Sequence, residues 1–264
     1  MRIAVVGPSN TLSADVPAAM AAFVRARYGP GGPEVVFHPQ CFERWGHFAG
    51  TDEARENAFV EVANDPDYDA VWFARGGYGA NRIAERAIAR MGDAALAKPF
   101  LGYSDCGFLL GGLMAKGIGL PVHAPMPSDI RREGGEAAVT RAIDWLLDPR
   151  PAERAQVAFN LTVFGHMLGT PLEPDLAGRV LLLEEVDEPL YRIDRALFHV
   201  TASTNVRRCT GIMLGRCTPV TPNEPDFASD EEAVARDWCT RSGIAWLGRA
   251  AIGHDADNIV VPFG

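Results

Sequence analysis

A serine, a glutamate and a histidine occupy positions in this chain that suit acyl-transfer chemistry. Ser104 lies between the apolar pair Phe100–Leu101 and a helix-like stretch, so its hydroxyl is expected on a sharp strand-to-helix turn. Glu184 ends the apolar string RVLLLE, and His254 lies in the string IGHD. In a catalytic triad, a histidine takes the serine proton and a carboxylate orients the imidazole. Each residue also has an ordinary interpretation, as a helix cap, a solvated strand end or a surface loop histidine.

The string RGGYG, residues 75–79, is a second candidate for chemistry. Two adjacent glycines permit a backbone with positive φ and the close approach of a ligand. Their N–H groups could form half of an oxyanion hole. The string matches neither a dinucleotide-binding fingerprint nor a Walker loop. The alternatives are a tight turn without a ligand, or the anion cradle of a non-catalytic nucleotide- or sugar-binding α/β module.

The cysteines and histidines predict no metal and no cofactor. The histidines lack metal-ligand spacing, and the cysteines are odd in number with no CxxC pair, which argues against a disulfide framework and a zinc site. Cys106 adjoins the helix that follows Ser104, where a thiolate is favoured, so it is an alternative nucleophile. The ordinary interpretation is a thiol packed in the core. The five cysteines are Cys41, Cys106, Cys209, Cys217 and Cys239.

Composition and charge exclude several classes of partner. Apolar residues make up 47% of the 264 residues and charged residues 22%, which is typical of a globular protein. The net charge is −9 and the pI about 5.2, so nucleic acid and anionic membranes are poor partners. The N-terminal apolar run, 3–7, is too short for a signal peptide, and no segment approaches a membrane span. The sequence therefore predicts a soluble cytoplasmic protein.

Short apolar runs alternate with amphipathic stretches in the first half of the chain. This alternation is typical of right-handed βαβ units, so we expect an α/β domain with an open, doubly wound parallel sheet. Sites in such sheets lie at the carboxyl ends of strands, where GPS (7–9), RGGYG and GYSD (102–105) are expected to face one crevice. The expected strands are 3–7, 34–38, 67–73, 99–103 and 121–123. The expected helices are 14–28, one beginning at Thr51, 79–91 and 105–116.

Residues 126–155 are polar, contain Pro and Gly around one helix, and are predicted to link two domains. The first domain, residues 1–125, would carry the candidate serine. The second domain, residues 156–264, would carry the candidate glutamate and histidine. Its expected elements are strands at 179–184 and 211–214, helices at 191–201 and 230–242, and short strands and turns at the end.

Six strings of this sequence occur in the same order as in the serine LD-carboxypeptidase family, which the chain resembles over nearly its whole length. That family includes murein tetrapeptide LD-carboxypeptidases and the microcin C immunity peptidases. The combination of RGGYG, GYSD and LEEV followed by YRIDR is very specific. The strings are FAGTDEARENAF, FARGGYGANRI, FLGYSD, HAPM, LGTPLEPDLAGRVLLLEEVDEPLYRIDRAL and GHDADNIVVPFG.

The resemblance implies a role for each candidate residue. It makes Ser104 the nucleophile, Glu184 rather than Glu185 the triad acid, and His254 the base. It implies an oxyanion hole formed by the backbone N–H groups of Asp105 and Gly77. It also implies a parallel-sheet N-terminal domain, a smaller β-rich C-terminal domain, a cleft between the two, and a homodimer.

The implied reaction is hydrolysis of the L,D-amide bond before the terminal D-Ala of muropeptide tetrapeptides, in cytoplasmic peptidoglycan recycling. The alternative substrate is an aminoacyl-nucleotide amide of the microcin type. A carboxypeptidase must bind a free carboxylate, which a guanidinium can hold through two hydrogen bonds. Arg75 and Tyr78 are the predicted substrate-binding residues, and Arg82, Arg192 and Arg195 are further candidates for the carboxylate.

This sequence departs from the family at Ala158–Phe159, where two glycines are usual. The larger side chains are expected to fill space near the cleft and to alter the shape of the substrate that fits. The chain is also short for the family, so some specificity loops are expected to be trimmed.

Overall fold

Five strands from the first half of the chain and one from its C-terminal end build a six-stranded sheet in the computed structural model, which describes residues 1–264. The strand order is β12-β5-β4-β3-β1-β2, and every pair is parallel except β12 with β5. Without β12 this is the 2-1-3-4-5 order of flavodoxin-like sheets. The strands are β1 (Arg2–Val6), β2 (Glu34–Phe37), β3 (Ala70–Phe73), β4 (Pro99–Gly102), β5 (Leu120–His123) and β12 (Val261–Pro262).

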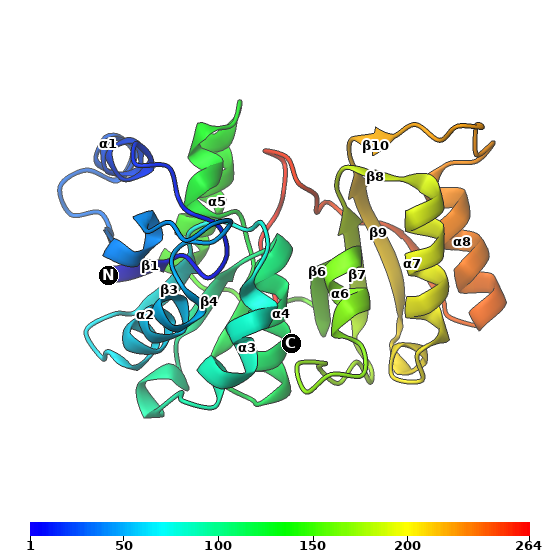
Figure 1. Cartoon of the computed structure of the whole chain (residues 1–264), viewed down its shortest axis with the longest axis horizontal. Helices are drawn as coiled ribbons and strands as arrows, with labels where there is room; N and C mark the ends of the chain where they lie inside the picture. Colours follow the sequence, from blue (N-terminus) through cyan, green and yellow to red (C-terminus); the bar gives the residue numbers. More distant parts are fainter.

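Helices cover both faces of this sheet, because successive strand residues point to opposite sides. Ile3 and Val5 pack with α1 and α5, whereas Ala4 and Val6 pack on the face covered by α2, α3 and α4. The doubly wound α/β domain is therefore confirmed (Figure 1). The helices are α1 (Val16–Tyr28), α2 (Asp52–Asn64), α3 (Ala80–Ile88), α4 (Gly107–Ala115) and α5 (Gly135–Leu147).

Helix α5, in the segment predicted as a linker, is part of the first core. Its buried residues share a hydrophobic cluster with strands β1, β3, β4 and β5. The 3-10 helix Pro127–Arg131 precedes it and contacts both α5 and α1. The segment 126–147 is therefore packed against the sheet that carries Ser104.

The second half of the chain forms a four-stranded parallel sheet with helices packed against it (Figure 1). Strand β6, which the sequence pattern does not reveal, has four consecutive buried residues and so lacks an alternating pattern. The strands are β6 (Gln156–Asn160), β7 (Val180–Glu185), β9 (Gly211–Cys217) and β11 (Trp246–Arg249), with the two-residue strands β8 (Glu188–Pro189) and β10 (Val220–Thr221). The helices are α6 (Leu161–Met167), α7 (Leu190–Ala202) and α8 (Glu231–Ser242).

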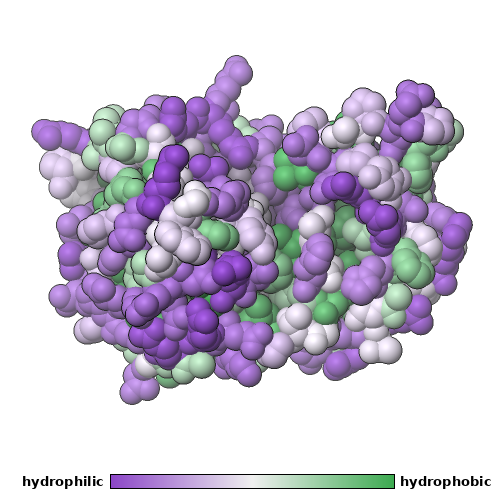
Figure 2. All heavy atoms as spheres, in the orientation of Figure 1, coloured by the Kyte–Doolittle hydropathy of each residue, from purple (hydrophilic) through white to green (hydrophobic).

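Residues 250–264 leave the second sheet and return to the first. Phe263 N donates to Pro121 O at 2.9 Å, and Gly264 N donates to Gln156 O at 3.2 Å, so this segment joins β5 to β6. Hydrophobic side chains gather in the groove between the two halves, and hydrophilic ones cover most of the rest of the face shown in Figure 2. None of the helices has the length and apolar character needed to cross a bilayer.

Candidate active site

Ser104 follows β4 on a sharp turn. Its φ is +59°, in the left-handed region that a serine rarely adopts. The chain then enters the 3-10 helix Ser104–Cys106 and helix α4. A strained serine at a strand-to-helix junction projects its hydroxyl away from the sheet, in the manner of a nucleophile elbow.

The glycine-rich turn lies directly against this serine. A Cβ added at Gly76 would be 2.9 Å from both Cβ and Oγ of Ser104 and 3.6 Å from Asp105 N, so only glycine allows this approach. Gly77 has a φ of +121°, which favours glycine, and its N–H forms no hydrogen bond within the chain. Of the two residues predicted for the oxyanion hole, Asp105 directly follows Ser104, and Gly77 follows the glycine that contacts Ser104 and lines the same cleft.

The buried carboxylate of Asp105 ties the three small-residue clusters together. Its Oδ2 accepts a hydrogen bond from Ser9 Oγ at 2.5 Å and another from Ala80 N at 2.8 Å. Burial raises the pKa of this carboxyl, and the two donors oppose that shift. The strings GPS, RGGYG and GYSD therefore meet at one crevice, as predicted, and the Asp105 side chain holds them together. The sequence predicts a role only for the backbone N–H of Asp105.

Glu184 and His254 form a close pair on the other side of the site. Glu184 Oε2 lies 2.6 Å from His254 Nδ1, and the glutamate side chain is fully buried. A proton on Nδ1 leaves Nε2 as the acceptor of the neutral imidazole. The neighbouring Glu185 binds Asn160 Nδ2 at 2.7 Å and Thr162 Oγ1 at 2.6 Å instead. The two adjacent acids therefore have different partners.

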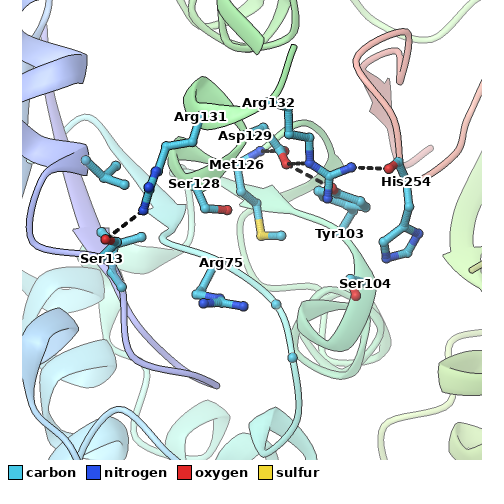
Figure 3. A pocket seen from close by; sticks show the side chains of 14 residues that line it. Ser13, Arg75, Tyr103, Ser104, Met126, Ser128, Asp129, Arg131, Arg132 and His254 are labelled. Carbon is cyan, nitrogen blue, oxygen red and sulfur yellow. Dashed lines mark hydrogen bonds and ion pairs between the residues drawn. The ribbon is translucent and has the colours of Figure 1, made fainter. Parts of the chain in front are cut away.

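Ser104 and His254 line the same cleft, which has a volume of about 520 Å³ (Figure 3). The His254 ring packs against the Tyr103 ring with centroids 4.9 Å apart, and no hydrogen bond joins it to Ser104. The other lining residues come from the first half of the chain: Leu12, Ser13, Val16, Arg75, Gly76, Gly77, Tyr103, Met126, Ser128, Asp129, Arg131 and Arg132.

Arg75 points into this cleft and Tyr78 does not line it. The Arg75 guanidinium donates to Thr11 O at 3.3 Å and forms no ion pair, so it is the arginine of the cleft without a carboxylate partner. Tyr78 is 47% exposed and packs beside Phe48, with ring centroids 6.0 Å apart. The structure thus brings one of the two predicted substrate-binding residues to the cleft.

The other candidate arginines are engaged elsewhere. Arg82 pairs with Asp52 at 2.7 Å, joining α3 to α2. Arg192 and Arg195 lie on α7 and line a separate groove between α6 and α7, where Arg192 pairs with Glu188 at 3.1 Å. None of the three arginines lines the cleft that holds Ser104, and α7 contributes no residue to that cleft.

Cys106 does not support the alternative of a thiol nucleophile. Its side chain is buried, and Sγ faces Arg75 O at 3.7 Å and Met126 Sδ at 3.9 Å instead of the cleft. Burial raises the pKa of this thiol well above its ordinary value, which disfavours the thiolate. The interpretation as a core cysteine is the one that the geometry supports.

Ala158 and Phe159 also lie away from the cleft. Both are buried in β6, and the Phe159 ring packs against Phe164 and Phe263 with centroids 5.2 Å and 5.1 Å apart. The expectation that they fill space beside the substrate is wrong, because β6 residues line the interface between the two sheets.

No three His, Cys, Asp or Glu side chains are close enough together to hold a metal ion.

Sequence reasoning missed the wall of the cleft formed by residues 126–132. The segment follows β5 directly, and the carboxyl end of β5 lies beside that of β4 in the parallel sheet. That topology was the available signal, since loops at these strand ends form the crevice of an open α/β sheet. The polar composition of the segment suggested a linker instead.

Comparison with known proteins now gives the class of the molecule. Residues 3–124 match the family model of the LD-carboxypeptidase N-terminal domain, and residues 157–264 match that of the LD-carboxypeptidase C-terminal domain. The chain therefore belongs to the LD-carboxypeptidase family and is a serine-type carboxypeptidase. An enzyme class sets aside the alternative of a non-catalytic binding module.

A relative of similar length agrees with this assignment, and solved structures share the fold. The chain is 28% identical to the murein tetrapeptide carboxypeptidase of Pseudomonas aeruginosa, over 100% of this chain and 91% of the relative. The fold matches a muramoyltetrapeptide carboxypeptidase from Oxalobacter formigenes with a TM-score of 0.84 and 24% identity, over 100% and 93% of the two chains. It also matches the microcin C7 self-immunity protein, solved with aspartyl sulfamoyl adenosine, with a TM-score of 0.83 and 16% identity, over 100% and 91%.

Proposed function

We propose that this carboxypeptidase hydrolyses the L,D-amide bond before the terminal D-Ala of muropeptide tetrapeptides in the cytoplasm, with Ser104, Glu184 and His254 as its triad. The observation that carries the proposal is the Glu184–His254 pair, at 2.6 Å, on the cleft that also holds the strained Ser104. The substrate follows from the murein tetrapeptide carboxypeptidase of P. aeruginosa, which matches over the whole chain.

In this mechanism, His254 Nε2 takes the proton of Ser104 as Oγ attacks the amide carbonyl. The N–H groups of Gly77 and Asp105 stabilise the oxyanion, and one such donor contributes about 3 kcal/mol in enzymes of this type. His254 then protonates the leaving amine of D-Ala. Water hydrolyses the acyl-enzyme by the same proton transfers in reverse. Glu184 keeps the proton on Nδ1 throughout.

The first test is mass spectrometry of a muropeptide tetrapeptide incubated with wild type and with Ser104→Ala. We expect loss of one D-Ala with the wild type alone. No loss with either protein at high enzyme concentration contradicts the muropeptide assignment, and an aminoacyl-nucleotide amide is then the next substrate to assay. Equal loss with both proteins contradicts the role of Ser104.

Arg75 is the residue that we propose for the free carboxylate of the leaving D-Ala, because its guanidinium faces the cleft without an acidic partner. Arg75→Ala is expected to lower kcat/KM about 10- to 100-fold, as expected for a lost charge-assisted hydrogen bond. The matched control is a tetrapeptide with a C-terminal amide, on which wild type and variant should be equally slow. If Arg75→Ala lowers kcat/KM on the C-terminal amide as much as it does on the free tetrapeptide, this role is contradicted.

The homodimer and the cytoplasmic location are further parts of the proposal. Light scattering of the purified protein tests the first, and fractionation of the source cells tests the second. Tyr78 lies outside the lining of the cleft, so it is expected to affect substrate binding only through the conformation of the RGGYG turn to which it belongs. Tyr78→Phe with an unchanged KM would remove it from the site.

A further inference from the structure

The loop that carries His254, residues 252–258, is held by side chains from both halves of the molecule. Arg216 on β9 pairs with Asp255 at 2.7 Å, and its backbone N–H donates to Ile252 O at 2.8 Å. Arg132 donates to the carbonyl oxygen of His254, and Arg141 on α5 donates to the carbonyl oxygens of Ala256 and Asn258. His123 Nε2 lies 3.0 Å from Asn258 Oδ1, which also accepts from Gly253 N at 3.2 Å. The loop belongs to no helix or strand, so these bonds fix its place.

Arg132 is itself fixed by a buried carboxylate beside the nucleophile. Its Nε lies 2.9 Å from Asp129 Oδ1. The Asp129 carboxylate also accepts from Met126 N at 2.8 Å and from the Tyr103 hydroxyl at 3.1 Å (Figure 3). Tyr103 directly precedes Ser104 in the chain. A continuous set of hydrogen bonds therefore runs from the residue before the nucleophile to the backbone of the base.

We propose that Arg132 is a positioning residue that sets where His254 stands relative to Ser104. Glu184 constrains the imidazole at Nδ1, and the Tyr103 ring covers one of its faces. Neither contact binds the backbone of His254 itself. Arg132, on the wall of the cleft, donates to the carbonyl oxygen of that residue, whereas Arg216 and Arg141 bind the loop at other positions. The inference rests on the proposed role of His254 as the base of Ser104.

Arg131 provides a matched control on the same wall. It also lines the cleft, but its guanidinium donates to Ser13 Oγ at 2.8 Å and pairs with Asp15 at 3.2 Å. It makes no hydrogen bond to the loop 252–258. Removing Arg131 therefore removes the same charge from the same surface without releasing His254.

The test measures how fast Ser104 reacts with a small, neutral alkyl fluorophosphonate, which requires no substrate recognition. Ser104 Oγ forms a bond to phosphorus, fluoride leaves, and the serine proton passes to His254 and then to water. Arg132→Ala is expected to slow this labelling and kcat for D-Ala release about 10- to 100-fold, because misplacement of a catalytic group by about 1 Å has an effect of this size. KM should change less than about twofold. Arg131→Ala is expected to slow labelling at least tenfold less than Arg132→Ala.

Added methylguanidinium is expected to restore part of the labelling rate of Arg132→Ala. If Arg132→Ala is labelled at the wild-type rate, the inference is overturned. A raised KM together with an unchanged labelling rate would also overturn it, because it would mean that Arg132 contacts the substrate. If Arg132→Ala does not fold, Arg132→Gln takes its place. Because glutamine loses the ion pair with Asp129, this variant should be labelled more slowly than both wild type and Arg131→Ala, and labelling at the wild-type rate would overturn the inference. Labelling without D-Ala release would contradict the substrate alone. Absence of both in the wild type would overturn the proposed function and this inference with it.

Discussion

The proposed nucleophile and the proposed base, Ser104 and His254, are positioned by different means. Ser104 stands on a backbone turn between β4 and α4, and the nearest constraint is the contact with Gly76. His254 stands on an irregular loop whose place depends on side chains from β5, α5, β7, β9 and the segment 126–132. Local structure therefore determines one partner and long-range hydrogen bonds determine the other, so the two should respond differently to mutation.

The largest expected effect comes from separating the adjacent acids of β7. Glu184→Gln should lower kcat about 10³- to 10⁴-fold, because an amide cannot hold the Nδ1 proton and orient the imidazole as a carboxylate does. Glu185→Gln should instead lower stability by about 2 kcal/mol, because it weakens buried hydrogen bonds to Asn160 and Thr162. Steady-state kinetics and urea unfolding of both variants check this. Equal kinetic losses would show that the two acids are not distinguished as the structure indicates.

A smaller effect is expected from crowding the serine side. Gly76→Ala places a methyl group 2.9 Å from Ser104 Oγ, so the hydroxyl must shift. We expect kcat to fall about 100-fold, because displacing a catalytic group by about 1 Å has an effect of this size in other enzymes. The midpoint of thermal unfolding should change little. Gly31→Ala is the matched control, since a Cβ there meets no atom within 4 Å. Full activity of Gly76→Ala would mean that the turn moves freely and does not fix the nucleophile.

The last expected effect is one on stability and concerns the His123 contact with the histidine loop. Burial lowers the pKa of His123 to about 4 from its ordinary value of 6.5. Between these values the unfolded chain binds a proton that the native chain does not, so this histidine makes unfolding easier as pH falls. The contribution of neutral His123 to the free energy of unfolding is complete above pH 6.5 and is lost by about pH 4. The difference amounts to roughly 3 kcal/mol.

The measurement is the free energy of unfolding at several pH values for wild type and His123→Gln. The difference between the two should shrink as the pH falls from about 6.5 to 4. Burial raises the pKa of Asp105, Asp129 and Glu185, whose contributions have the opposite sign and are common to both proteins. A difference that does not vary with pH would contradict the buried neutral state of His123.

The difference between the two sides also explains what the sequence could reveal. Strand periodicity and the glycine-rich turns predicted the first sheet and the crevice around Ser104, because these features are local. The polar composition of residues 126–155 predicts a linker, because a sequence does not show that polar residues such as Asp129 and Arg132 pair with one another in the folded chain. The distinction between Glu184 and Glu185 came from family resemblance, as nothing in the string LLEEV separates two adjacent acids before their partners are placed.

The return of residues 250–264 to the first sheet has a consequence for the motion of the enzyme. The backbone crosses between the two sheets twice, once before β6 and once before β12, and β12 pairs with β5 at the edge of the first sheet. Two crossings and this pairing leave little freedom for the halves to open and close as hinged lids do. The aperture of the cleft is therefore preset, and substrates must be selected by fitting it and not by enclosure.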